Sequence, residues 1–216
     1  MSEFYTPDNV PDEYDPVFTE SELEKLKASI QWEYGLWNSY VGDLNTSQPG
    51  PTNLPSFTTF RGSILAPAFA DYRTEDVTIS FYIKHDFLLY TKVYPYIHWS
   101  PGNNTNTGVV RWGLEYILAK GHGQEAFTSP TTVYVEQAGS GTAYQHQLVQ
   151  VAEGDGILTE SLEPNSVLMF RVFRDGAHAN DTFTGNAFGL YLGLHYQRTR
   201  EGTLNKEPDF YRKEES

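Results

Sequence analysis

The sequence has no cysteine, little positive charge and no long apolar run. Without cysteine, disulfides, thiolate catalysis and cysteine-ligated metal sites are excluded. Lys and Arg total 15 against 28 Asp and Glu, and the resulting formal charge of −13 opposes broad binding to nucleic acid or to an anionic membrane. Apolar stretches are interrupted well short of the about 18 residues that a bilayer span needs, so we expect neither a membrane span nor a secretory signal.

Aromatic residues are abundant instead. They make up 15% of the 216 residues, whereas all hydrophobic residues together reach only 39% and charged residues 20%. With many Thr, Ser, Asn and Gly beside them, this mixture suits pleated sheets and tight turns. The length fits one domain of ordinary size, or one domain with an arm.

Period-two alternation of apolar and polar residues predicts strands, and Gly- and Asn-rich turns separate them. In the last of these strands we expect the apolar residues from Phe188 to Tyr196 to share one face and His195 to point the other way. The predicted fold is all-β, an antiparallel β-sandwich of jelly-roll type. Its expected strands are 77–83, 93–99, 109–118, 131–136, 143–151, 166–174 and 187–197.

Three zones divide the chain. Residues 1–55 are interpreted as an acidic N-terminal arm with one short helix and a linker, residues 56–198 as the sandwich, and residues 199–216 as a charged tail. Thr19 with Glu22, or Ser21 with Glu24, could cap the helix. An apolar stripe would then either pack on the sandwich or dock on a neighbouring subunit. The stripe, a possible interface, consists of Leu23, Leu26, Ile30, Tyr34 and Trp37.

Catalytic and metal-binding patterns are weak. The histidines lack the spacing of one intervening residue that strand-borne metal sites favour, although a β-sandwich metalloenzyme using some of them is one alternative. The run from Arg174 to Asp181 lacks a calcium-loop spacing and is better interpreted as a turn. We therefore expect no catalytic residue, no cofactor and no metal ligand. The histidines of that alternative are His85, His98, His146 and His195.

Three side chains of one strand are candidates for contact with a ligand. Tyr94, Tyr96 and His98 alternate along the strand and share a face that could be the less buried one. Exposed aromatic rings can stack on sugars or anchor a protein interface. A glycan-binding platform therefore stays open beside a structural role.

Several segments together resemble proteins of tailed bacteriophages and prophages that are virion-structural or of unassigned role. They are YPYIHWSP at 94–101, GVVRWGLEY at 108–116, GTAYQHQ at 141–147, FRVFRDGAHANDTF at 170–183 and LHYQ at 194–197. The resemblance covers about 74–197.

This resemblance implies a non-enzymatic virion structural protein that is assembled in the host cytoplasm. It would attach through its arm and sandwich interfaces to the capsid shell, as decoration, or to the head–tail junction. Its partners would be capsid or connector subunits and further copies of itself, with no nucleic acid and no membrane. A tail-fibre or receptor-binding module that recognises cell-surface glycan is the main alternative.

Overall fold

The computed structural model describes residues 31–36, 54–104, 107–152, 156–157 and 162–198, with the backbone alone for residues 31–36. These residues form strands and no helix, so the described part of the chain holds no helix that could span a membrane. The strands are β1 (Gln31–Leu36), β2 (Ser56–Arg61), β3 (Ile64–Phe69), β4 (Thr74–Tyr82), β5 (Val93–Pro101), β6 (Val109–Ala119), β7 (Thr131–Ala138), β8 (Gln147–Gln150), β9 (Val167–Asp175) and β10 (Ala187–Arg198).

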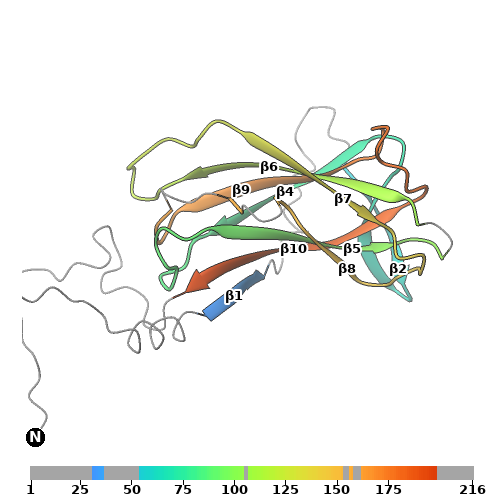
Figure 1. Ribbon diagram of the computed structural model, residues 1–216, viewed down its shortest axis with the longest axis horizontal. Coiled ribbons are helices and arrows are strands. Elements are labelled where there is room, and N and C mark those ends of the chain that lie inside the picture. Colours follow the sequence, from blue (N-terminus) through green and yellow to red (C-terminus); the bar gives the residue numbers. More distant parts are fainter. Residues whose placement is uncertain (1–30, 37–53, 105–106, 153–155, 158–161, 199–216) are drawn as a thin grey trace, which may run out of the picture.

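Two antiparallel sheets face each other (Figure 1). Sheet A has the order β2-β3-β10-β5-β8, and β1 also pairs with β10; sheet B has the order β4-β9-β6-β7. From β3 to β10 the chain changes sheet at every step except that from β6 to β7. The prediction of an all-β, sandwich-like fold is confirmed.

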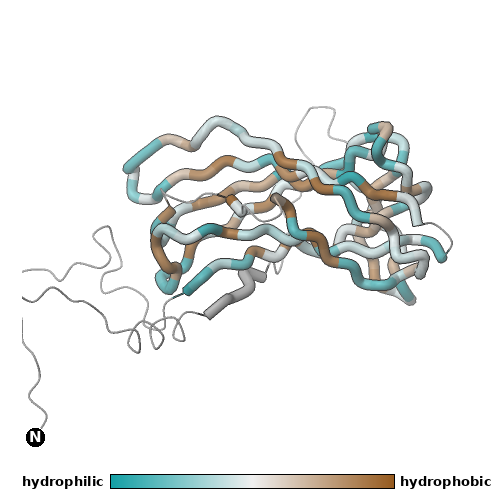
Figure 2. The backbone as a smooth tube through the Cα atoms, in the orientation of Figure 1, coloured by the Kyte–Doolittle hydropathy of each residue, from teal (hydrophilic) through white to brown (hydrophobic). Residues whose placement is uncertain are grey.

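The core lies between the sheets and is built by alternation along the strands (Figure 2). Ile97 and Trp99 enter it from β5, and Trp112 and Leu114 from β6. The two tryptophan rings meet edge to face with centroids 6.0 Å apart. Each large side chain removed from water in this way contributes about 1.5–3 kcal/mol, so the period-two pattern is enough to place the inner faces.

One predicted face is wrong at its start. β10 carries a bulge between Gly189 and Tyr191, where its register against β5 shifts. The inserted residue reverses the alternation, so Phe188 leaves the main core and packs with Ala66 and Ala68 on the outer side of sheet A, and Leu190 packs against this second cluster as well. Beyond the bulge the prediction holds, because Leu192, Leu194 and Tyr196 are in the core.

The predicted helical stripe is also wrong at Tyr34. This residue lies in β1, whose backbone pairs antiparallel with β10 and places Tyr34 opposite His195. A strand partner more than 150 positions away supplies backbone hydrogen bonds that local helical spacing cannot reveal. Leu23, Leu26, Ile30 and Trp37 lie outside the described residues.

Two further differences concern strand limits. The hairpin of β2 and β3 was not predicted, because Pro67 and two alanines interrupt the β-propensity of its second strand. The strand expected at 143–151 is confined to Gln147–Gln150, and Tyr144 lies before it with a positive φ of 63°.

Candidate functional site: the outer face of sheet A

The candidate site is the surface of sheet A that points away from the core. On β5, Val93, Ile97 and Trp99 are buried in the core. Tyr94 and Tyr96 alternate with them and therefore lie on the opposite, outer face, together with His98. The three candidate ligand-facing residues thus occupy one face, beside the outward positions of β10 and β8.

His98 is the centre of this face and is only 8% exposed. Its ring stacks on Tyr191 at 4.0 Å and on His146 at 5.1 Å, and its Nδ1 lies 2.9 Å from His146 Nε2. Burial, followed by the nearby charges of His146 and His195, lowers the pKa of His98 to about 4. The imidazole is therefore neutral at pH 7, and one hydrogen bond joins it to His146.

Gly193 makes room for His98. A Cβ at this position would lie 3.1 Å from His98 Nε2, closer than ordinary van der Waals contact. The missing side chain lets the imidazole lie flat on β10, where it meets Tyr191. A glycine inside a strand often marks such a close approach.

Tyr96 and His195 form the neighbouring pair. Their ring centroids are 4.1 Å apart, and the Tyr96 hydroxyl donates a 2.6 Å hydrogen bond to Gln150 Oε1. Burial lowers the pKa of His195. The sheet register sets His195 opposite Tyr94 on one side and Tyr34 on the other. One member of the predicted interface set therefore adjoins the predicted ligand-facing set.

An apolar cluster continues the face toward the β2–β3 hairpin. Phe60 meets Phe188 at 5.1 Å and Tyr144 at 5.3 Å, in both cases edge to face. Tyr144 and His146 belong to the segment that precedes β8, so one short segment contributes both to this cluster and to the histidine stack. The Tyr144 N–H anchors the segment by donating to the carbonyl oxygen of Pro101 at 2.9 Å.

The two outer faces differ in charge. Sheet B carries ion pairs outward: Arg111 with Glu136 at 2.6 Å, and Arg171 with Asp76 at 3.0 Å. The outward positions of β5, β8 and β10 hold no acidic or basic residue, apart from the histidines. Those positions are Tyr94, Tyr96, His98, Ser100, Leu148, Gln150, Phe188, Leu190, Tyr191, Gly193, His195 and Gln197.

The run from Arg174 to Asp181 is structural. The side chains of Arg174 and Asp181 are fully buried. Two hydrogen bonds, of 2.9 and 2.7 Å, join Nε and Nη2 of the Arg174 guanidinium to the two carboxylate oxygens of Asp181. Nη1 donates to the carbonyl oxygens of Phe69 and Gly185, and Nη2 also donates to that of Phe183. All five donors are thereby used, and the pair holds the loop before β10 onto the sandwich.

Two members of the site were not predicted. Tyr191 and Gln150 complete a stack and the hydrogen bond, but their contribution depends on the bulge and on the β5–β8 register. His146 was named from the sequence only as a possible metal ligand, and the structure stacks its ring on His98. Gly189 inside an apolar strand was a sequence signal for that bulge. His85 does not join the stack formed by His98 and His146.

Among the described residues no group of three or more His, Asp or Glu side chains is arranged to hold a metal ion.

No family model matches the chain, and no curated protein matches it. Among solved structures, a chain from "Structure of infectious bursal disease virus Gx strain" is similar, at 11% identity and a TM-score of 0.33. The match covers 79% of this chain and 51% of that chain, so this chain spans about half the length of its structural neighbour.

Proposed function

We propose that this protein is a non-enzymatic structural component of a bacteriophage particle that attaches to the capsid shell or the head–tail junction. Attachment would use the outer face of sheet A. The phage assignment rests on the sequence resemblance across residues 74–197, and the choice of surface rests on the charge pattern.

The observation that carries the proposal is an uncharged aromatic face on a chain of net charge −13. Cores of protein interfaces are depleted in charged residues and enriched in tyrosine. Tyr191 and Leu148, which are 38% and 42% exposed, offer apolar surface for such a contact. The acidic surface elsewhere would keep the protein soluble before assembly.

The fold fits this role. We propose that the sandwich is a jelly roll, because strands β3-β10-β5-β8 and β4-β9-β6-β7 form two four-stranded layers and the chain crosses from one layer to the other after nearly every strand. Jelly rolls are common in viral capsids.

The test is binding to particles assembled without this protein. Tyr191→Glu places a charge on the outer face of sheet A, whereas the matched control Tyr82→Glu places one on β4, where Tyr82 is 68% exposed. We expect co-sedimentation with particles to be lost in the first variant and kept in the second. Equal binding by both variants would refute this choice of surface. Cryo-electron microscopy of the complete particle then locates the chain.

A receptor-binding module is the second candidate, because an aromatic ring next to an amide is a combination that recognises sugars. Tyr96 with Gln150 provides it here, close to Tyr191. Binding on a glycan array that disappears with Tyr96→Ala would favour this function, and an array without signal would exclude it for the glycans tested.

A further inference from the structure

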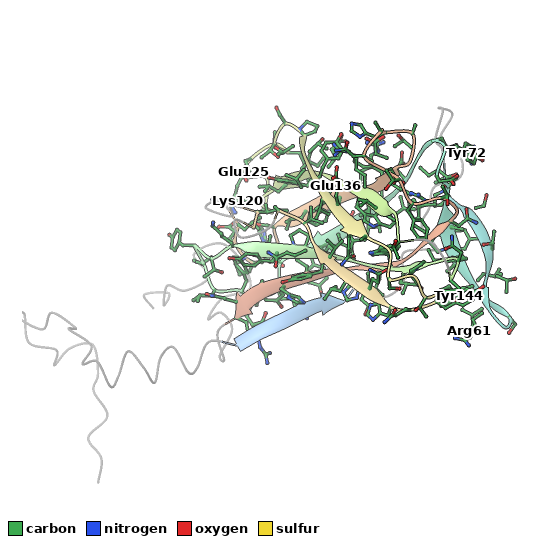
Figure 3. All side chains as sticks on the ribbon, turned by 45° about the vertical axis from the view of Figure 1, so that its right-hand side comes forward. Arg61, Tyr72, Lys120, Glu125, Glu136 and Tyr144 are labelled. Atoms are coloured by element: carbon green, nitrogen blue, oxygen red, sulfur yellow. The ribbon has the colours of Figure 1, made fainter. Side chains whose placement is uncertain are left out.

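The β2–β3 hairpin is held to the sandwich at its base. β3 pairs with β10 through two residues only, Ala68 with Phe188 and Phe69 with Ala187. Beyond them the hairpin continues to the turn at Gly62, whose φ of 60° suits a two-residue connection. Figure 3 shows Arg61 and Tyr144 side by side near the turn end of the hairpin.

Large apolar side chains of this hairpin face water. Ile64 is 65% exposed, Leu65 59% and Phe57 42%. Phe57 and Leu65 lie on one face of the hairpin and Ile64 on the other, because neighbouring residues of a strand alternate. Of the three, Phe57 lies on the strand that ends the sheet.

The hairpin is also free of acidic residues. From Ser56 to Ala70, Arg61 is the only charged residue, in a chain with 28 Asp and Glu. The other strands with a single neighbour differ: β1, β4 and β7 each carry at least one acidic residue, and β8 has only four residues. β2 is therefore the longest terminal strand without negative charge.

A terminal strand presents backbone N–H and C=O groups that can pair with another strand. Proteins usually protect such an edge with charge or proline within the strand. In β2, Ser56 to Phe60 contain neither, and β3 is the one neighbour that pairs with β2 among the described residues. The bulge at Phe60 disturbs only the end next to the turn.

We propose that β2 pairs antiparallel with β2 of a second copy of this chain, across a two-fold axis. Such an isologous contact uses the same surface twice. When the two-fold axis passes beside Thr58, Ser56 of one copy faces Phe60 of the other and Arg61 lies beyond the paired residues, so the two cations stay apart. Phe57 of each copy then lies opposite Thr59 of the other, so its exposed ring gains a cross-strand neighbour.

An uncharged strand edge, with its alternating backbone N–H and C=O groups, is complementary to itself, so a second copy is the occupant that fits it. Two chains of net charge −13 repel each other over most of their surfaces, and the hairpin is where a contact brings no acidic residues together. The inference goes beyond the proposed function and does not depend on it, because two copies could pair in solution without any particle.

The first test is the mass of the full chain in solution, measured by light scattering from roughly 1 to 200 µM. We expect a dimer. Phe57→Asp with Thr59→Asp adds two charges to β2 and should leave a monomer. The matched control, Thr78→Asp with Ser80→Asp, adds two charges to exposed positions of β4, the terminal strand of sheet B, and should stay dimeric. A monomeric wild-type chain over this range would overturn the proposal.

A cysteine scan tests the contact without added charge. Because the chain has no cysteine, Phe57→Cys, Thr58→Cys and Thr59→Cys each introduce a single thiol. A thiol near a two-fold axis of paired strands lies within disulfide distance of its own copy. We expect at least one of these variants to form a covalent dimer about tenfold faster than the control Ser80→Cys. Equal rates at all four positions would refute pairing through β2.

Discussion

Replacement of Asp181 by asparagine keeps the size of the side chain and removes its charge. The partner, Arg174, is fully buried and donates through Nε and Nη2 to the two carboxylate oxygens. Removal of one member of a buried ion pair costs about 3–5 kcal/mol, because the other charge stays buried without compensation. The asparagine also turns an NH₂ group toward a guanidinium that can only donate.

That loss is a large part of the about 5–15 kcal/mol that stabilises a typical domain. The melting temperature should fall by about 6–20 °C, since 1 kcal/mol corresponds to about 2–4 °C at this size. Urea unfolding followed by tryptophan fluorescence measures the change in the free energy of unfolding. Trp99 is a suitable reporter, because its ring centroid lies 6.0 Å from that of Phe183 in the loop before β10.

The matched control is Asp76→Asn. Asp76 pairs with Arg171 at 3.0 Å, but their side chains are 21% and 35% exposed, so the loss should stay below about 1 kcal/mol. Combining Asp181→Asn with Arg174→Met should cost less than the sum of the two single changes, by about 2 kcal/mol. Additive losses, or an Asp181→Asn loss no greater than that of the control, would refute the argument from buried charge.

Three other outcomes are expected. The pKa of His98 is about 4 in the folded chain and about 6.5 when unfolded, so the unfolded state binds more protons between these values. The contribution of His98 to the free energy of unfolding is therefore fully present above pH 6.5 and is lost on acidification to pH 4, a decrease of about 3 kcal/mol. His98→Gln should remove this part of the pH dependence of urea unfolding. Gly113→Ala should cost about 1–3 kcal/mol in the same assay, because its Cβ would come within 2.1 Å of the Phe173 ring. Asn180→Ala should raise the pKa of Glu136 toward its ordinary value in an NMR titration, because the Asn180 side chain hydrogen-bonds the carboxylate and lowers that pKa.

The strands of the sandwich could be predicted where one face is buried and the other is exposed to solvent. The run from Val109 to Leu118 alternates because its inner residues fill the core while the outer ones face solvent. β1 could not be predicted in this way, since its pairing with β10 depends on residues far along the chain. The helical spacing that ends at Tyr34 and Trp37 was a local pattern, and at Tyr34 distant pairing overrode it.

The site was predicted in part for a related reason. Tyr94, Tyr96 and His98 come from one strand, and period two is enough to set them on one face. Tyr191 and His146 come from other segments and reach His98 because of a bulge and a short loop. Sequence patterns describe single strands, whereas the stack depends on which strands are neighbours.

The two surfaces without acidic residues have different orientations, and this bears on how the proposals combine. The outer face of sheet A points along the normal of the sheet, whereas the outer edge of β2 lies in its plane. Antiparallel pairing across a two-fold axis extends a sheet without turning either half over. Two copies joined through β2 would therefore present both outer faces to the same side. Each face could then bind one site of a repeating lattice, and the second contact would form at high effective concentration. A weak contact by one face would become a stable attachment by two. The edge of β2 would then join the copies, and the outer face of sheet A would attach them.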